Sequence, residues 1–152
     1  MTTGDSRYSD AEKNGLNTMG SFCAKSGFAV FNFKHYDEVQ KHWGEERILV
    51  NSDKYAAKLM VVYPGWQTSL HRHKVKHETF VCITGVGFID LEHNDQESSL
   101  RLSPGTRVEI PEDTWHRFGS DNGMMLLEVS THDDPSDCER KLESCKLVID
   151  DL

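Results

Sequence analysis

Short apolar runs separated by turn residues recur along the chain from residue 55 onward. Apolar runs of roughly four to eight residues, bounded by Gly, Pro, Asn and Asp, are typical of β-strands. The expected strands cover residues 57–63, 68–73, 79–84, 87–92, 100–102, 107–110, 116–118 and 124–130. Many short strands with such turns favour an all-β barrel or jelly roll, which closes or covers its sheet edges.

The two ends of the chain show a different pattern. Residues 1–25 are rich in polar residues with little apolar periodicity, which predicts a flexible N-terminal arm. Residues 27–33 and 47–51 read as strands, and residues 37–43 as one or two helical turns. The predicted organisation is an arm over 1–25, one β domain over 26–135 and a charged tail over 136–152. Within the tail, residues 146–149 read as a short helix or an edge strand.

Composition narrows the class of protein. The chain has 152 residues and a net charge of −8, which suits one domain and argues against nucleic acid or an anionic membrane as partner. No apolar run approaches the ~20 residues needed to span a membrane. The polar, acidic start resembles neither a signal nor a transit peptide, and the four cysteines have no close spacing. We therefore expect free thiols and a cytoplasmic location.

The most informative stretch reads Gly65-x5-His71-x-His73-x4-Glu78-x6-Gly85. In a strand, residues i and i+2 point to the same face, so His71 and His73 project together. A short turn then lets the next strand begin at Glu78, beside the histidine pair. Imidazoles and a carboxylate that converge inside a barrel are a site for a divalent metal.

A further ligand is available at His116, in the pattern Gly105-x5-Pro111-x4-His116. Three histidines and one glutamate leave two of six octahedral positions open, as a catalytic site requires. One His-x-His by chance is unremarkable among eight histidines. The full spacing with fixed glycines is much rarer, which favours the metal site.

These two stretches resemble the two motifs of the cupin family. The first matches at every fixed position, whereas the second has Asp113 where the family usually has Gly, and Ser120 where it often has Asn. The resemblance implies a double-stranded β-helix, or jelly roll, with His71, His73, Glu78 and His116 as ligands, and it argues against the metal-free epimerases of that fold. Mn²⁺ is the expected ion, with Fe, Zn, Co and Ni as alternatives.

Two further residues suggest a reaction. Lys76 lies in the motif loop, and Glu128 lies within an apolar strand. A solvated loop lysine and a glutamate on the outer strand face are the alternatives. If both point inward, they suit an aldose–ketose isomerisation through an enediolate, with the metal as Lewis acid. Glu128 would then move the proton as general base, and Lys76 would hold the substrate or the developing oxyanion.

The runs His71-Arg-His73, Glu78-Thr-Phe, Trp-His116-x-Phe and Glu128-Val-Ser-Thr look like those of small cupin sugar isomerases of the D-lyxose isomerase type. That resemblance implies Lys76 and Glu128 as the catalytic pair and a substrate similar to D-lyxose or D-mannose. Cupin phosphomannose isomerases also look similar, especially around residues 42–46, so a sugar phosphate is also a candidate substrate. Cupins commonly form homodimers, and residues 29–33 offer an edge for pairing.

Several residues have two readings. Trp66 and Trp115 are candidates for a wall under a sugar ring, or for packing at the barrel mouth. Arg72 is a candidate substrate-binding residue, and with Lys74, Lys76 and His77 it forms a run that suits a phosphate or a solvated strand end. The alternative functions are an Fe(II)-dependent dioxygenase with the same ligands, and a non-catalytic sugar-binding cupin.

Overall fold

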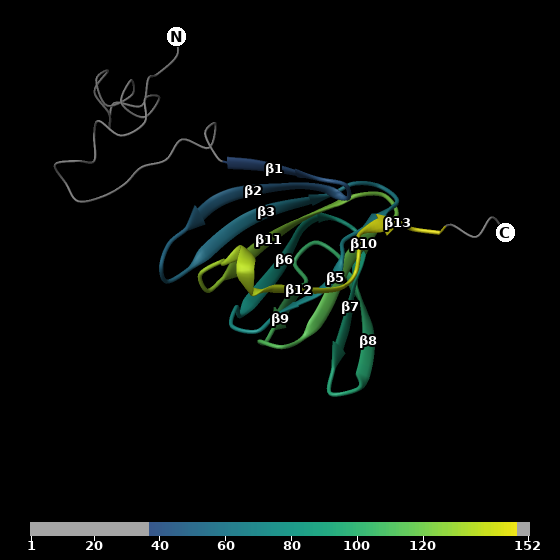
Figure 1. Cartoon of the computed structure of the whole chain (residues 1–152). Helices are drawn as coiled ribbons and strands as arrows, with labels where there is room; N and C mark the ends of the chain where they lie inside the picture. Colours follow the sequence, from purple (N-terminus) through teal and green to yellow (C-terminus); the bar gives the residue numbers. More distant parts are fainter. Residues whose placement is uncertain (1–36, 149–152) are drawn as a thin grey trace, which may run out of the picture. The chain divides into compact units, whose positions relative to one another are not determined.

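In a computed structural model of the chain, residues 37–148 are described, and they form two antiparallel sheets (Figure 1). The first sheet has six strands in the order β1-β2-β3-β11-β6-β9. Their bounds are β1 Asp37–Lys41, β2 Gly44–Asn51, β3 Ala56–Val62, β11 Met124–Ser130, β6 Glu78–Gly85 and β9 Arg107–Ile110. The strands β1, β2 and β3 are consecutive in the sequence, whereas the neighbours that follow them in the sheet, β11, β6 and β9, are not, as in a jelly roll.

The second sheet is built around β10, which pairs with β4 and β5 on one side and with β7 on the other. Its outer members are β8, beside β7, and β12 and β13, beside β5 and β4. The bounds are β4 Trp66–Gln67, β5 Leu70–His73, β7 Gly87–His93, β8 Gln96–Leu102, β10 Trp115–Ser120, β12 Cys138–Leu142 and β13 Cys145–Lys146. The only helix among residues 37–148 is a 3-10 turn, η1, over Pro135–Asp137. The predicted all-β jelly roll is confirmed.

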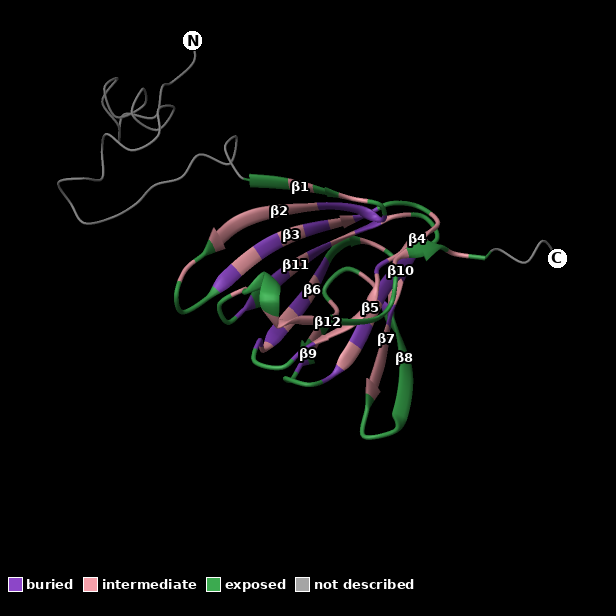
Figure 2. Ribbon diagram, viewed as in Figure 1, coloured by how far each residue is buried: buried purple, intermediate pink, exposed green. Residues whose placement is uncertain are grey.

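Burial alternates residue by residue along the central strands of the first sheet (Figure 2). On β3 the buried positions are Ala56, Lys58, Met60 and Val62, and on β11 they are Met124, Leu126, Glu128 and Ser130. The inner face is therefore apolar at one end of the strands and polar at the other. This division along the strands separates the hydrophobic core from the candidate site.

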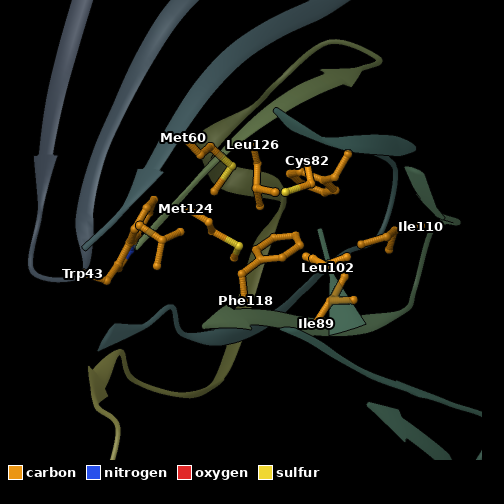
Figure 3. Packing of buried hydrophobic residues seen from close by; sticks show 11 residues of the cluster. Trp43, Met60, Cys82, Ile89, Leu102, Ile110, Phe118, Met124 and Leu126 are labelled. Atoms are coloured by element: carbon orange, nitrogen blue, oxygen red, sulfur yellow. The ribbon is translucent and has the colours of Figure 1, made fainter. Parts of the chain in front are cut away.

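The apolar half packs against the second sheet to form the core. Figure 3 shows Met60, Leu126 and Cys82 of the first sheet pointing toward Phe118 and Ile89 of the second. Phe80 and Phe118 meet with ring centroids 4.5 Å apart. Fully burying a side chain of this size contributes about 1.5–3 kcal/mol, so this cluster fixes the spacing of the two sheets.

The predicted helical turns over residues 37–43 are wrong, because this segment forms β1 and a tight turn into β2. Lys41 pairs directly with Gly44 across that turn. A side chain at Gly44 would overlap the backbone carbonyl of Val61, so the hairpin lies closely against β3. As an exposed edge strand, β1 has no alternating apolar pattern by which the sequence could reveal it.

The remaining predictions for the ends of the domain have mixed outcomes. The predicted strand over 27–33 lies outside the described residues. In the tail, the structure has η1, β12 and β13, and β13 includes Lys146. Cys82, Cys138 and Cys145 are free thiols, as expected. Among residues 37–148, no helix has the length and apolar character to cross a membrane.

Candidate metal centre

Three histidines on adjacent strands lie together on the inner face of the second sheet. His71 and His73 alternate along β5, and His116 on β10 is the register partner of His71. The ring centroids of His71 and His116 are 4.4 Å apart, and those of His71 and His73 are 5.3 Å apart. One ligand nitrogen from each ring lies within 4.8 Å of the other two. The structure thus brings together the three histidines predicted as ligands, here called the histidine triad.

Each imidazole of the triad is held by its Nδ1 atom. Nδ1 lies 2.9 Å from the Ser69 carbonyl oxygen in His71, 2.9 Å from the Asp137 carbonyl oxygen in His73, and 3.0 Å from the Thr114 carbonyl oxygen in His116. A carbonyl accepts only, so each Nδ1 carries the proton and each Nε2 keeps a free lone pair. Such outer contacts to a carbonyl orient histidines that bind a metal.

The protonation of the triad also suits a metal. Burial, with the nearby His116, lowers the pKa of His71 to about 3, and burial lowers the pKa of His73. These rings are therefore neutral at neutral pH, which is the form that binds a metal ion. His116 Nε2 is buried and has no hydrogen-bond partner within the described chain. An orphaned nitrogen of this kind is costly unless an ion fills its lone pair, so the residues fit a divalent metal.

Glu78, the fourth predicted ligand, begins β6 and faces the histidine triad from the first sheet. Its Oε2 lies 3.2 Å from His116 Nε2, and its Oε1 lies 3.7 Å from His73 Nε2. Burial raises the pKa of Glu78, but the polar and cationic groups around it, including the Lys76 ammonium, outweigh burial and hold that pKa below its usual range. An ionised carboxylate therefore lies beside the lone pairs of the triad.

Lys76 and Glu128 are both buried at the same place. Lys76 Nζ lies 2.6 Å from Glu78 Oε1 and 3.0 Å from Glu128 Oε1. Burial lowers the pKa of Lys76, but the carboxylates of Glu128 and Glu78 outweigh burial and raise that pKa above its usual range. Burial raises the pKa of Glu128, and the Lys76 charge opposes this only in part. Neither residue has the solvated position considered as its alternative.

Asp133 and Lys58 complete this group, which we call the carboxylate–lysine cluster (Lys58, Lys76, Glu78, Glu128 and Asp133). The Asp133 carboxylate lies 2.5 Å from Lys58 Nζ and 2.8 Å from Lys76 Nζ. Burial raises its pKa, but hydrogen bonds from the two lysines bring that pKa down to about 2. The Asn51 side chain donates to the Asp133 carbonyl and accepts from its N–H, which fixes the backbone there.

Asp137 was not predicted, and it holds the motif loop in place. Its carboxylate accepts backbone hydrogen bonds from Lys74 at 2.8 Å, Val75 at 3.1 Å and Lys76 at 2.9 Å. Its own carbonyl accepts from His73, as described above. Asp137 therefore connects the start of β12 to both a triad histidine and Lys76.

A cavity of about 570 Å³ opens over the site and reaches the solvent. This volume is typical of small-molecule sites, which measure roughly 300–1,000 Å³. Its floor includes His71, His73 and the carboxylate–lysine cluster, and its mouth includes residues of the β1–β2 hairpin and of the C-terminal segment. The site thus has room for a ligand of sugar size beside the triad.

The three residues predicted to bind substrate lie elsewhere. Trp115 alternates with the buried His116 on β10, and the Arg72 guanidinium stacks on its ring at 4.5 Å. Arg72 is also bound by Glu139 and Asp113. Trp66 packs against the edge of the core. None of the three lines the cavity.

Comparison with known proteins agrees with this geometry. Residues 58–130 match the model of the Cupin_2 family, described as a cupin domain. This match identifies residues 58–130 as a cupin domain. At Asp113, where cupins usually have glycine, the backbone adopts a left-handed conformation with φ of 61°, which Asp tolerates better than most residues. This departure therefore leaves the position of His116 intact.

Relatives of the cupin domain include two curated proteins. A D-lyxose/D-mannose isomerase of Thermosediminibacter oceani is 30% identical over 115 residues, covering 59% of this chain and 64% of that protein. A mannose-1-phosphate guanylyltransferase of Sinorhizobium fredii is 29% identical over 91 residues, covering 59% of this chain and 17% of that protein. The chain thus spans less than two thirds of each.

Solved structures with the same fold are more distant. An oxalate decarboxylase of Bacillus subtilis superposes with a TM-score of 0.66 at 19% identity, over 72% of this chain and 31% of that one. The capsular polysaccharide assembling protein CapF of Staphylococcus aureus gives a TM-score of 0.61 at 20% identity, over 76% of this chain and 32% of that one. At these identities the likeness supports the fold alone.

Proposed function

We propose that this protein is a metal-dependent aldose–ketose isomerase that acts on a sugar or a sugar phosphate. The observation that carries the proposal is the position of Lys76, whose ammonium lies 2.6 Å from Glu78 and 3.0 Å from Glu128. A buried acid–base pair thus adjoins the residues that fit a metal. Perturbed, buried titratable groups at the floor of a cavity are typical of catalytic sites.

The metal would be held by His71, His73, His116 and Glu78, and Mn²⁺ is the ion we propose for these nitrogen and oxygen ligands. Fe, Co, Ni and Zn are alternatives for the same set. When bound, it supplies Lewis-acid polarisation of a carbonyl group.

Glu128 is the proposed general base. In the aldose-to-ketose direction it removes the proton from C2 and returns it to C1, while a second proton passes from the C2 hydroxyl to the oxygen on C1. The oxidation states of the two carbons thereby exchange and no external oxidant is needed. Burial raises its pKa toward the range in which a carboxylate acts both as base and as acid. Lys76 is protonated and donates hydrogen bonds from Nζ, so it is positioned to stabilise the negative charge that develops on the sugar oxygen.

The curated relatives support a sugar as substrate. The name of one gives D-lyxose and D-mannose, and the name of the other gives mannose 1-phosphate. The volume of about 570 Å³ accommodates an open-chain hexose or its phosphate.

A panel of aldoses and aldose phosphates with added Mn²⁺, scored for ketose formation, tests the proposal. Glu128→Gln keeps the shape of the side chain and removes the base, so we expect loss of isomerisation with sugar binding retained. His77→Gln is a matched control, because His77 is tied to Glu109 and Glu112 on the outside. Activity must persist without oxygen, and ketose formation by Glu128→Gln at the wild-type rate would refute the proposed base.

We also propose a homodimer, on the resemblance to cupins. Sedimentation at micromolar concentration should give twice the mass of the chain, and a monomer alone would contradict this.

A further inference from the structure

Strand β12 brings one arginine into the cavity. Cys138 pairs with His73 and Arg140 pairs with His71 across the β12–β5 ladder. Paired residues of an antiparallel ladder point to the same face, so Arg140 shares the face of the histidine triad. Both Cys138 and Arg140 line the cavity.

The neighbours of Arg140 on β12 confirm this alternation. Glu139 binds Arg72 at 2.8 Å, and Lys141 binds Glu92 at 2.7 Å and lies over the Trp115 ring. These contacts are on the opposite face from the cavity. The side chain of Arg140 therefore reaches the mouth of the cavity, where it is exposed to solvent.

Three lysines also line the cavity, and each of them is paired with a carboxylate. Lys41 lies 3.7 Å from Glu46, Lys58 and Lys76 share Asp133, and Lys76 also binds Glu78 and Glu128. Arg140 has no carboxylate within 4.0 Å among residues 37–148. Among the lysine and arginine side chains of the described cavity wall, it is the one without a carboxylate partner, so its charge is available to an anionic group.

The cations that the sequence suggested for a phosphate have other partners. Lys74 binds Asp113 at 2.7 Å, and His77 lies 3.0 Å from Glu109. Arg72 is stacked on Trp115 and paired with Glu139. The motif loop therefore offers no free cation for a phosphate, whereas the mouth of the cavity does.

We propose that Arg140 is a specificity-determining residue that binds an anionic group at the end of the substrate remote from its carbonyl. A guanidinium presents N–H donors in a planar fork that matches the oxygens of a phosphate monoester or a carboxylate. The inference rests on the proposed function for the sugar, and it selects a sugar phosphate or a sugar acid over a neutral sugar. Glu143 also lines the cavity, so a carboxylate lies on the wall that presents Arg140.

The test is calorimetric binding of a hexose 6-phosphate, a hexuronate and the neutral hexose to the Mn²⁺-loaded full chain. The variants are Arg140→Gln and, as a matched control, Arg101→Gln, which removes an exposed arginine that does not line the cavity. A charge-assisted hydrogen bond contributes about 1.5–3 kcal/mol, which corresponds to about tenfold or more in affinity. We expect Arg140→Gln to weaken one or both anionic ligands by that factor and to leave the neutral hexose unchanged.

The ligand whose affinity falls in Arg140→Gln identifies the anionic group as phosphate or carboxylate. Equal binding of the anionic ligands by Arg140→Gln and the wild type, or no preference for them over the neutral hexose in the wild type, overturns the inference. Because the affinity and the formation of ketose are measured separately, the two proposals fail separately. Anion binding that depends on Arg140 with no ketose formed refutes only the isomerase, and ketose formation with the anionic ligands bound equally by both proteins refutes only the role of Arg140.

Discussion

The hydrogen bonds of Asp137 make a quantitative prediction, because one half-buried residue holds three consecutive N–H groups of the motif loop with its carboxylate. Asp137→Ala removes all three bonds. Because water partly reaches the acceptor, each bond contributes a net value of about 0.5–1 kcal/mol. The free energy of unfolding should therefore fall by about 1.5–3 kcal/mol when all three bonds are lost. Asn keeps one neutral acceptor oxygen, so Asp137→Asn should lose about half as much.

Urea unfolding of the wild type, both Asp137 variants and Ser136→Ala measures these losses. Ser136 is the matched control, because it lies in the same turn and its side chain makes no hydrogen bond to any residue from 37 to 148. The loop also carries Lys76, and the Asp137 carbonyl orients His73, so we expect Asp137→Ala to weaken Mn²⁺ binding as well. A free energy of unfolding for Asp137→Ala equal to that of Ser136→Ala would refute the role given to Asp137.

Two further predictions concern Asp133, which lines the cavity, and Trp115, which does not. Asp133 has a pKa lowered to about 2, so its stabilising effect is complete above about pH 4 and is lost as the pH falls toward 2. Asp133→Asn should therefore be less stable than the wild type by about 1–2 kcal/mol at pH 7, and this difference should narrow as the pH is lowered in acid unfolding. A difference that stays constant with pH would contradict the stabilising role of the ion pairs of Asp133. Trp115→Ala should cost about 0.5–1 kcal/mol through its lost contact with Arg72, and should leave sugar binding unchanged, because Trp115 does not line the cavity. Calorimetry that shows weaker sugar binding by this variant would contradict that placement.

The sequence was sufficient to locate most strands of the domain, although the single strand predicted over 68–73 is divided between β4 and β5. The strands over 107–110 and 124–130 have the predicted bounds, since the first ends at Pro111 and the second follows Gly123. The spacing of His71 and His73 predicted a common face, and the second motif predicted that His116 would join them. Periodicity of two is a local property, so it can be read without knowledge of the tertiary structure.

The residues contributed by the C-terminal segment could not be predicted in this way. Asp133 and Asp137 precede β12, and Arg140 lies on it. Strand β12 pairs with β5, although more than sixty residues separate Asp137 from His73. Their sequence is charged, as in a solvated tail, and no local pattern states which strand such a segment pairs with. Alternation also left open whether Glu128 faced inward, and the register of β11 against β3 and β6 resolves this, since it places Glu128 beside Lys58 and Phe80.

The metal content of the purified chain tests the central claim most directly. After dialysis against Mn²⁺ and removal of free ion, elemental analysis should find one ion per chain in the wild type and in His77→Gln. It should find none in His116→Gln, since that variant removes the orphaned Nε2 atom from the triad. A wild-type chain without bound metal, or His116→Gln with the full amount, would contradict a metal centre at His71, His73, Glu78 and His116.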